Sequence, residues 1–130
     1  MAYYLDTSAY LKLVVTAAGT RALRRWLTNA KPQLVASELL RTEALRAARR
    51  HSPGALREAR RRLAAVTLLS VTSEICDRAV DLDPSILRSL DAIHLATALS
   101  LGDELEGIVT YDERLAAAAH VHGVAVLAPS

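Results

Sequence analysis

The chain is poor in cysteine, lysine and aromatic residues. Among its 130 residues there are one cysteine, two lysines, four tyrosines, one tryptophan and no phenylalanine. The single cysteine, Cys76, cannot form an internal disulfide, which is typical of a protein from a reducing compartment. Its position in a helical run predicts an inert, buried side chain, so we assign it no function.

Long apolar runs are also absent, although hydrophobic residues make up 52% of the chain. No run approaches the roughly 20 apolar residues of a membrane span, and the opening residues, MAYYLDTS, do not have the pattern of a signal peptide. We therefore expect a cytoplasmic protein with no membrane contact. Residues 1–130 have a suitable length for a single domain that buries its own core without disulfides or a structural metal.

Positive charge is concentrated in the middle of the chain. Residues 41–62 contain eight arginines and two glutamates, a charge of +6, so the rest of the chain carries −4 of the net +2. Arginine binds phosphate groups well, which favours an anionic partner. A GC-rich genome or a solvated helix face would produce the same pattern. On the first interpretation, the candidate phosphate-binding residues are Arg46, Arg49, Arg50, Arg57 and Arg61.

The hydrophobic pattern predicts strands that alternate with helices. Strands are expected at 3–5, 34–35, 67–71, 107–110 and 124–127. Helices are expected at 9–15, 21–29, 38–50, 55–65, 73–80 with Ser73 as its cap, 89–99 and 113–120. Such alternation indicates an α/β fold with a mostly parallel central sheet covered on both faces.

Two of the predicted strands end in an aspartate with hydroxyl residues beside it. Asp6 follows the first strand and precedes Ser8, and Asp112 comes two residues after Thr110, at the end of the fourth strand. In open α/β sheets, ligands bind outside the carboxyl ends of the strands, so both aspartates are candidate site residues. Both could instead be N-caps of the helices that follow them.

Glu43 and Asp91 are candidates for a different reason. At about 100° per residue, Glu43 falls inside the apolar arc of its helix, between Leu39 and Ala47. A carboxylate there needs a partner, because burying an unpaired charge is costly. Asp91 opens a helix that is apolar nearly all round, where it could bind a ligand or stabilise the helix N-terminus. His94 shares its face, and we favour a hydrogen-bonded core histidine over a metal ligand.

The four carboxylates could converge in such a fold. Carboxylates about 4 Å apart repel by roughly 4 kcal/mol per pair at an effective dielectric of 20, so a cluster of them favours a hard cation. Oxygen ligands suit Mg²⁺ or Mn²⁺, which usually keep several waters and bind substrate phosphates. The predicted chemistry is metal-assisted attack of water on a phosphodiester, with the arginines holding the backbone.

Four segments resemble the acidic motifs of the PIN domain, and in particular those of the VapC toxins of bacterial VapBC toxin–antitoxin pairs. They are LDTSAYLKL at 5–13, SELLRTEALRA at 37–47, SLDAIHLATA at 89–98 and VTYDERLAAAA at 109–119. The resemblance implies a PIN-like α/β/α sandwich and a Mg²⁺- or Mn²⁺-dependent endoribonuclease. The chain departs from many relatives at Thr16, Ala17 and Ala18, where they carry a glutamate.

The resemblance also implies roles for individual residues. The catalytic cluster would be Asp6, Glu43, Asp91 and Asp112. The three aspartates would be metal ligands, and the glutamate would position the attacking water or accept its proton. Ser8 and Thr110 would support the carboxylates by hydrogen bonds, and the five arginines named above would bind RNA.

The family further implies a homodimer and a VapB antitoxin whose C-terminal segment blocks the acidic pocket, with DNA bound only through the antitoxin complex. The main alternative is a catalytically silent module of the same fold that binds RNA or protein. A receiver domain is disfavoured because it needs a lysine near the last strands. A haloacid-dehalogenase-like phosphatase is disfavoured because Ser8 stands where it needs a second aspartate.

Overall fold

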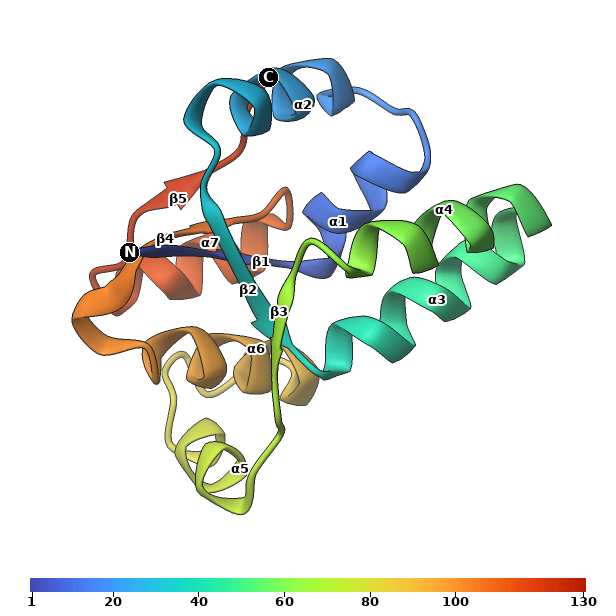
Figure 1. Ribbon diagram of the computed structural model, residues 1–130. Coiled ribbons are helices and arrows are strands. Elements are labelled where there is room, and N and C mark those ends of the chain that lie inside the picture. The colour runs from blue at the N-terminus through green and yellow to red at the C-terminus, as the bar shows by residue number, and fades with distance from the viewer.

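A parallel sheet of five strands forms the centre of the computed structural model, which describes residues 1–130 (Figure 1). The strand order is β3-β2-β1-β4-β5, and every neighbouring pair is parallel. The strands are β1 (Ala2–Leu5), β2 (Gln33–Ser37), β3 (Thr67–Leu69), β4 (Leu105–Val109) and β5 (Val126–Leu127). Because parallel strands need crossover connections, helices return the chain along both faces of the sheet.

Helices cover the two faces of the sheet and complete the sandwich. They are α1 (Thr7–Val14), α2 (Thr20–Ala30), α3 (Leu39–His51), α4 (Pro53–Leu63), α5 (Ser73–Val80), α6 (Ser89–Leu99), the short 3₁₀ helix η1 (Gly102–Glu104) and α7 (Glu113–Val121). Successive strand residues face opposite sides, so Leu5 packs with Leu23 and Leu40 of α2 and α3, whereas Tyr4 packs with Leu95 and Leu115 of α6 and α7. The expected α/β/α sandwich is confirmed.

The carboxyl ends of the central strands lie at one edge of the sheet. Leu5 of β1 is in register with Val109 of β4, and Tyr4 is in register with Val35 of β2. The ladder continues one residue further, because the Asp6 N–H donates to the Val109 carbonyl at 3.0 Å. Residues that follow these strands therefore meet where α1, α3 and α7 begin.

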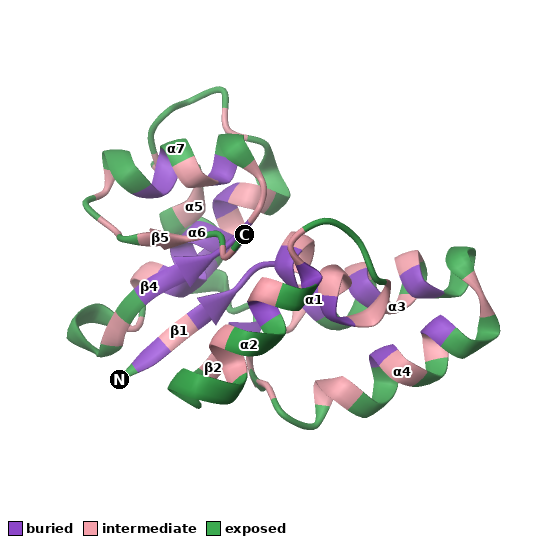
Figure 2. Ribbon diagram, turned by 90° about the horizontal axis from the view of Figure 1, so that it is seen from above, coloured by how far each residue is buried: buried purple, intermediate pink, exposed green.

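Helices α3 and α4 form a hairpin that extends beyond the sheet (Figures 1 and 2). The two helices pack closely because small residues lie between them: Ala44, Ala48, Ala55 and Ala59 are all buried. Ser52 makes the turn, and its Oγ accepts a hydrogen bond from the Ala55 N–H at 3.0 Å. The far end of the hairpin is mostly exposed (Figure 2).

Two local expectations about α5 are wrong. Cys76 is exposed rather than buried, because α5 packs against α6 through one side and Ile75 is its only buried residue. Thr72 rather than Ser73 caps the helix, since the Thr72 Oγ1 accepts from the Ile75 N–H at 3.2 Å.

No helix of the structure is both long and apolar enough to cross a membrane.

Candidate active site

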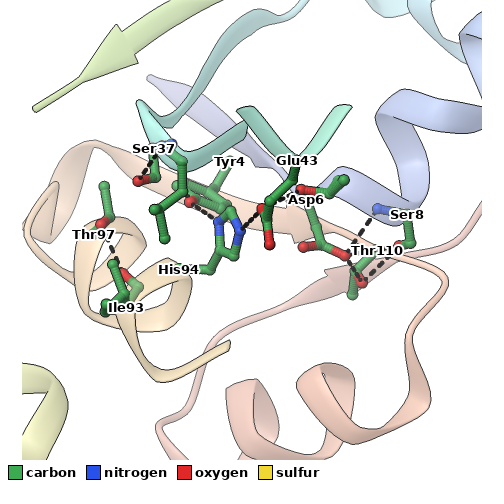
Figure 3. Close-up of polar contacts among 11 residues, drawn as sticks. Tyr4, Asp6, Ser8, Ser37, Glu43, Ile93, His94, Thr97 and Thr110 are labelled. Carbon is green, nitrogen blue, oxygen red and sulfur yellow. Dashed lines mark hydrogen bonds and ion pairs between the residues drawn. The ribbon is translucent and has the colours of Figure 1, made fainter. Parts of the chain in front are cut away.

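The four candidate carboxylates come from four separate elements. Asp6 follows β1, Asp112 precedes α7, Asp91 lies in the first turn of α6, and Glu43 lies in the second turn of α3. Figure 3 shows Asp6 and Glu43 side by side, with Thr110 beyond Asp6. The parallel sheet explains this arrangement, because it brings the carboxyl ends of β1 and β4 together.

Asp6 is held in place by hydroxyl groups on one of its two carboxylate oxygens. Its Oδ2 accepts hydrogen bonds from the Ser8 Oγ at 2.7 Å and the Thr110 Oγ1 at 2.9 Å, and a longer one of 3.3 Å from the Ser8 N–H (Figure 3). The residue is 5% exposed. Its Oδ1 has no partner within the chain, yet no buried side-chain oxygen lacks a hydrogen bond, so Oδ1 faces solvent.

Asp112 also combines a capping role with a free oxygen. Its Oδ1 accepts from the Arg114 N–H at 2.8 Å and the Leu115 N–H at 3.1 Å, so it is the N-cap of α7. Its Oδ2 makes no hydrogen bond. The two interpretations of Asp6 and Asp112 are therefore compatible, because capping occupies only one carboxylate oxygen of each residue and leaves the other available.

Asp91 makes no hydrogen bond and carries the clearest electrostatic sign of the cluster. Burial raises its pKa, and the nearby charges of Asp112 and Asp6 raise it further. Arg88 and His94 act in the opposite direction and do not cancel this effect. Asp6 and Asp112 are thus both close enough to Asp91 to repel its charge, which is the condition under which a bound cation is favourable.

Glu43 is tied to a chain of buried hydrogen bonds that the sequence pattern did not reveal. Its Oε1 accepts from the Thr7 Oγ1 at 2.8 Å and lies 2.6 Å from the His94 Nε2. The His94 Nδ1 lies 2.6 Å from the Tyr4 Oη, which itself accepts from the Ser37 N–H at 3.0 Å (Figure 3). His94 is a buried core residue, as favoured, but it also connects the core to the candidate site.

The donors of this chain can be assigned from its chemistry. Burial raises the pKa of Tyr4, so its hydroxyl stays protonated. The Tyr4 oxygen already accepts from Ser37, and its proton has only the His94 Nδ1 as an acceptor. In the neutral histidine the Nε2 therefore carries the proton and donates to Glu43.

The contact between His94 and Glu43 shifts the pKa values of both residues. Burial alone would lower the pKa of His94, but the hydrogen bond to Glu43 and the charges of Asp6, Glu43 and Asp91 outweigh burial, and the pKa is raised. Burial alone would raise the pKa of Glu43, but the hydrogen bond and charge of His94, with the Thr7 hydroxyl, lower it. Glu43 is thus ionised at neutral pH, and its 26% exposed side chain has Oε2 free.

The aspartate cluster fits a hydrated divalent cation better than an enclosed one. No group of three or more histidine, cysteine, aspartate or glutamate side chains is arranged as the ligands of one ion. The available donors are carboxylate oxygens only, one free on Asp6, one free on Asp112 and both on Asp91. Mg²⁺ is usually held by one or two carboxylates and keeps several waters, and this donor set meets that requirement.

The predicted arginines lie on the hairpin, where Arg46 is three residues from Glu43 and the others are further along α3 or on α4. Arg46, Arg49 and Arg50 line a shallow hollow of about 160 Å³ on α3. Arg50 is seven residues from Glu43, which corresponds to about 10 Å along a helix axis. Arg61 is paired with Glu58 at 2.5 Å, and Arg57 is exposed on α4. The hairpin therefore offers positive charge that begins one turn from Glu43 and extends away from the aspartates.

The sequence of this chain is similar to a known domain family and to known proteins. The family model described as "PIN domain" matches residues 3–121. Ribonuclease VapC46 of Mycobacterium tuberculosis is 46% identical over 129 residues, covering 99% of this chain and 98% of that protein.

Solved structures are similar in fold. The VapC20 toxin of Mycobacterium tuberculosis, described as cleaving the sarcin–ricin loop, superposes with a TM-score of 0.78 at 20% identity, covering 98% of this chain and 100% of that one. The VapBC2 complex of Rickettsia felis, bound to a DNA fragment from its promoter, contains a chain that superposes with a TM-score of 0.75 at 10% identity, covering 98% of each chain.

Proposed function

The chain belongs to the PIN-domain family, in its VapC branch, and we propose that it is a metal-dependent endoribonuclease, the toxin of a type II toxin–antitoxin pair. The observation that carries the proposal is the convergence of Asp6, Asp91 and Asp112 from three separate elements, close enough for the charges of Asp112 and Asp6 to raise the pKa of Asp91, beside an ionised Glu43. The 46% identical relative named a ribonuclease supports RNA as the substrate.

In the proposed reaction, Asp6, Asp91 and Asp112 would hold a hydrated Mg²⁺ or Mn²⁺ ion through their free oxygens, either directly or through its waters. When bound, such an ion lowers the pKa of a coordinated water and neutralises charge on the phosphodiester. Ser8 and Thr110 keep Asp6 in one orientation through its Oδ2. The aspartates therefore need no rearrangement of their hydrogen bonds to act as ligands.

Glu43 handles the proton of the attacking water in this proposal. Its Oε2 is free, and the hydrogen bonds to Oε1 from His94 and Thr7 keep the carboxylate ionised and oriented. The water oxygen would bond to phosphorus as one of its protons passes to Glu43, and the bond from phosphorus to the leaving oxygen would break, with that oxygen taking a proton from solvent water. His94 is a positioning residue here, because it acts through Glu43 rather than on the substrate.

The proposal includes partners and location. A VapB-type antitoxin would block the acidic pocket, DNA would be bound only through that complex, and the protein would be a cytoplasmic homodimer made of one PIN domain over residues 1–130. Arg46, Arg49, Arg50, Arg57 and Arg61 would hold the RNA backbone away from the cleaved bond. The structure of a related VapBC complex on promoter DNA supports the antitoxin and DNA parts.

The test is RNA cleavage by the purified chain, with Asp6→Asn as the inactive variant and Asp103→Asn, an exposed aspartate of η1, as the matched control. Wild type and control should cleave RNA with Mg²⁺ or Mn²⁺ and stop with a chelator, whereas Asp6→Asn should not cleave. Either ion should also raise the melting temperature of wild type but not of Asp6→Asn, since only a chain that binds it is stabilised.

Induction in a bacterial host separates the nuclease from a silent binding module. Growth arrest with new, discrete RNA 5′ ends in wild type alone would support the nuclease. Equal arrest by wild type and Asp6→Asn, or a metal-loaded chain that cleaves no class of RNA, would overturn it in favour of the binding module.

A further inference from the structure

A second cavity adjoins the aspartate cluster on the side away from the hairpin. Its volume is about 440 Å³, and it lies between the loop that precedes α6 and the outer side of α7. Asp91 belongs to its lining and therefore to both sites, while Arg88 and Arg114 contribute positive charge. The remaining wall is apolar, with Ile86 and Leu87 as its largest members.

The loop that forms one wall is anchored at several points. Leu82 and Leu87 pack against the core between the sheet and α6 and α7. The His122 Nε2 donates to the Asp83 carbonyl at 2.9 Å, which ties the loop to the end of α7. Ile86 is nevertheless 89% exposed. An anchored loop thus presents an apolar side chain to whatever enters the cavity.

The two arginines of the cavity are free of partners within the chain. Arg41, Arg61 and Arg62 are each paired with a glutamate, whereas Arg88 and Arg114 make no side-chain hydrogen bond or ion pair. Each guanidinium has five N–H donors in a planar fork, which matches a phosphate group. With Asp91 counted, the lining carries a net charge of +1.

These features together match one nucleotide better than a simple anion. A free phosphate would use the two arginines but leave the apolar wall of Ile86 and Leu87 uncovered. A nucleotide has a phosphate for the arginines and a flat base for the apolar wall, and cavities of about 300–1,000 Å³ are typical of ligand pockets. The base must be unstacked to enter, which favours single-stranded RNA.

We propose that this cavity binds the nucleotide next to the cleaved bond, with its base against Ile86 and Leu87 and its phosphate between Arg88 and Arg114. The proposal rests on the proposed nuclease function and extends it to substrate selection. Because Asp91 lies between the cavity and the other aspartates, the bound nucleotide places the neighbouring phosphodiester at the acidic cluster. The cavity wall, rather than the hairpin, then discriminates between bases at this position.

The test measures binding separately from cleavage. In the Asp6→Asn background, single-stranded RNA oligonucleotides that differ at one position are titrated by fluorescence anisotropy at several salt concentrations. Arg88→Gln and Arg114→Gln should each weaken binding by about 10-fold or more, as expected for a hydrogen bond to a charged group. Each should also reduce the slope of log K against log salt by about 0.7. Arg78→Gln, on the exposed side of α5, is the matched control and should change neither.

The apolar wall needs its own variant. Ile86→Ser should change which base is preferred and leave the salt slope unaltered, since it removes apolar contact and no charge. In the otherwise wild-type chain, the same change should alter the sequence at mapped cleavage sites. Far-UV circular dichroism should match wild type for all these variants, because the replaced side chains are exposed.

The outcomes separate the two proposals. A chain that cleaves RNA, but in which Arg88→Gln and Arg114→Gln behave like Arg78→Gln, overturns the cavity proposal and leaves the nuclease intact. A chain that binds RNA through these arginines but cleaves none overturns the nuclease, and the cavity then stands as a binding site only. Cleavage whose sequence is unchanged by Ile86→Ser overturns the assignment of the base to this wall.

Discussion

Replacing Tyr4 by phenylalanine removes one oxygen from the centre of the buried hydrogen-bond chain. That oxygen accepts from the Ser37 N–H at 3.0 Å and lies 2.6 Å from the His94 Nδ1, and the residue is completely buried. The ring itself is kept, so packing is unchanged, but two buried polar groups lose their partner. At about 1–3 kcal/mol for each unsatisfied group, the expected loss is about 2–6 kcal/mol.

Tyr10→Phe is the matched control because Tyr10 is also a fully buried tyrosine. Its hydroxyl donates to the Ala59 carbonyl in the middle of α4. That carbonyl keeps its hydrogen bond within the helix, so the change removes one bond. Burial raises the pKa of Tyr10 to about 12, so its hydroxyl is neutral at pH 7. The expected loss is about 1 kcal/mol.

Urea unfolding followed through the fluorescence of Trp26, the only tryptophan, measures both losses. At about 4 °C per kcal/mol for a domain of this size, Tyr4→Phe should also lower the melting temperature by about 8–24 °C. Losses that are equal for the two variants within about 0.5 kcal/mol would refute the reasoning, because they would mean that Ser37 and His94 find other partners.

Three further predictions concern stability. The difference in the free energy of unfolding between wild type and Glu43→Gln should be largest between about pH 4.5 and 6.5, where Glu43 is ionised and His94 is protonated. Because the pKa of Glu43 is lowered in the folded state, the stability that its ionised form contributes is lost as the pH falls below 4.5 through the folded pKa. Because the pKa of His94 is raised in the folded state, the stability that its protonated form contributes is lost as the pH rises above 6.5 through the folded pKa. A pH-independent difference, from urea unfolding across pH 3–9, would contradict the pairing. Gly19→Ala should lower the melting temperature more than Gly102→Ala. Both glycines have positive φ, but only a Cβ at Gly19 would meet other atoms, at 3.2 Å and 3.3 Å. A larger decrease for Gly102→Ala would contradict this. Cys76→Ser should change the free energy of unfolding by less than about 0.5 kcal/mol because the side chain is exposed, and a larger loss would indicate a packing role.

The sequence was sufficient where the structure depends on local patterns. Alternating apolar runs and helical stripes predicted all five strands and seven α-helices, and the α/β/α order followed from their alternation. The proximity of Asp6 to Asp112 was also predictable, because each follows a strand and the carboxyl ends of neighbouring parallel strands lie at the same edge of the sheet. Their capping roles were foreseen as an alternative, and the structure contains those caps.

Other contacts depend on how distant elements pack, and no local pattern encodes that. Glu43 and His94 are 51 positions apart and meet only because α3 and α6 approach the same sheet edge. The inward position of Glu43 predicted a partner but did not identify it. Burial of α5 was misjudged at Cys76 because the pattern does not reveal how little of that helix touches the rest of the chain.

The central place of β1 has a consequence for synthesis. A chain grows from its N-terminus, so Asp6 is made before β4, with 104 positions between Asp6 and Thr110. The strand before Asp6 has β4 as a neighbour, and Thr110 and Asp112 follow β4. A nascent chain that ends before β4 lacks the neighbour on one side of β1, and its aspartate cluster is incomplete. For a protein that we propose cleaves RNA, the site can assemble only after Asp112 has been made, so a growing chain that has not reached Asp112 lacks the complete site that would cleave its own messenger RNA.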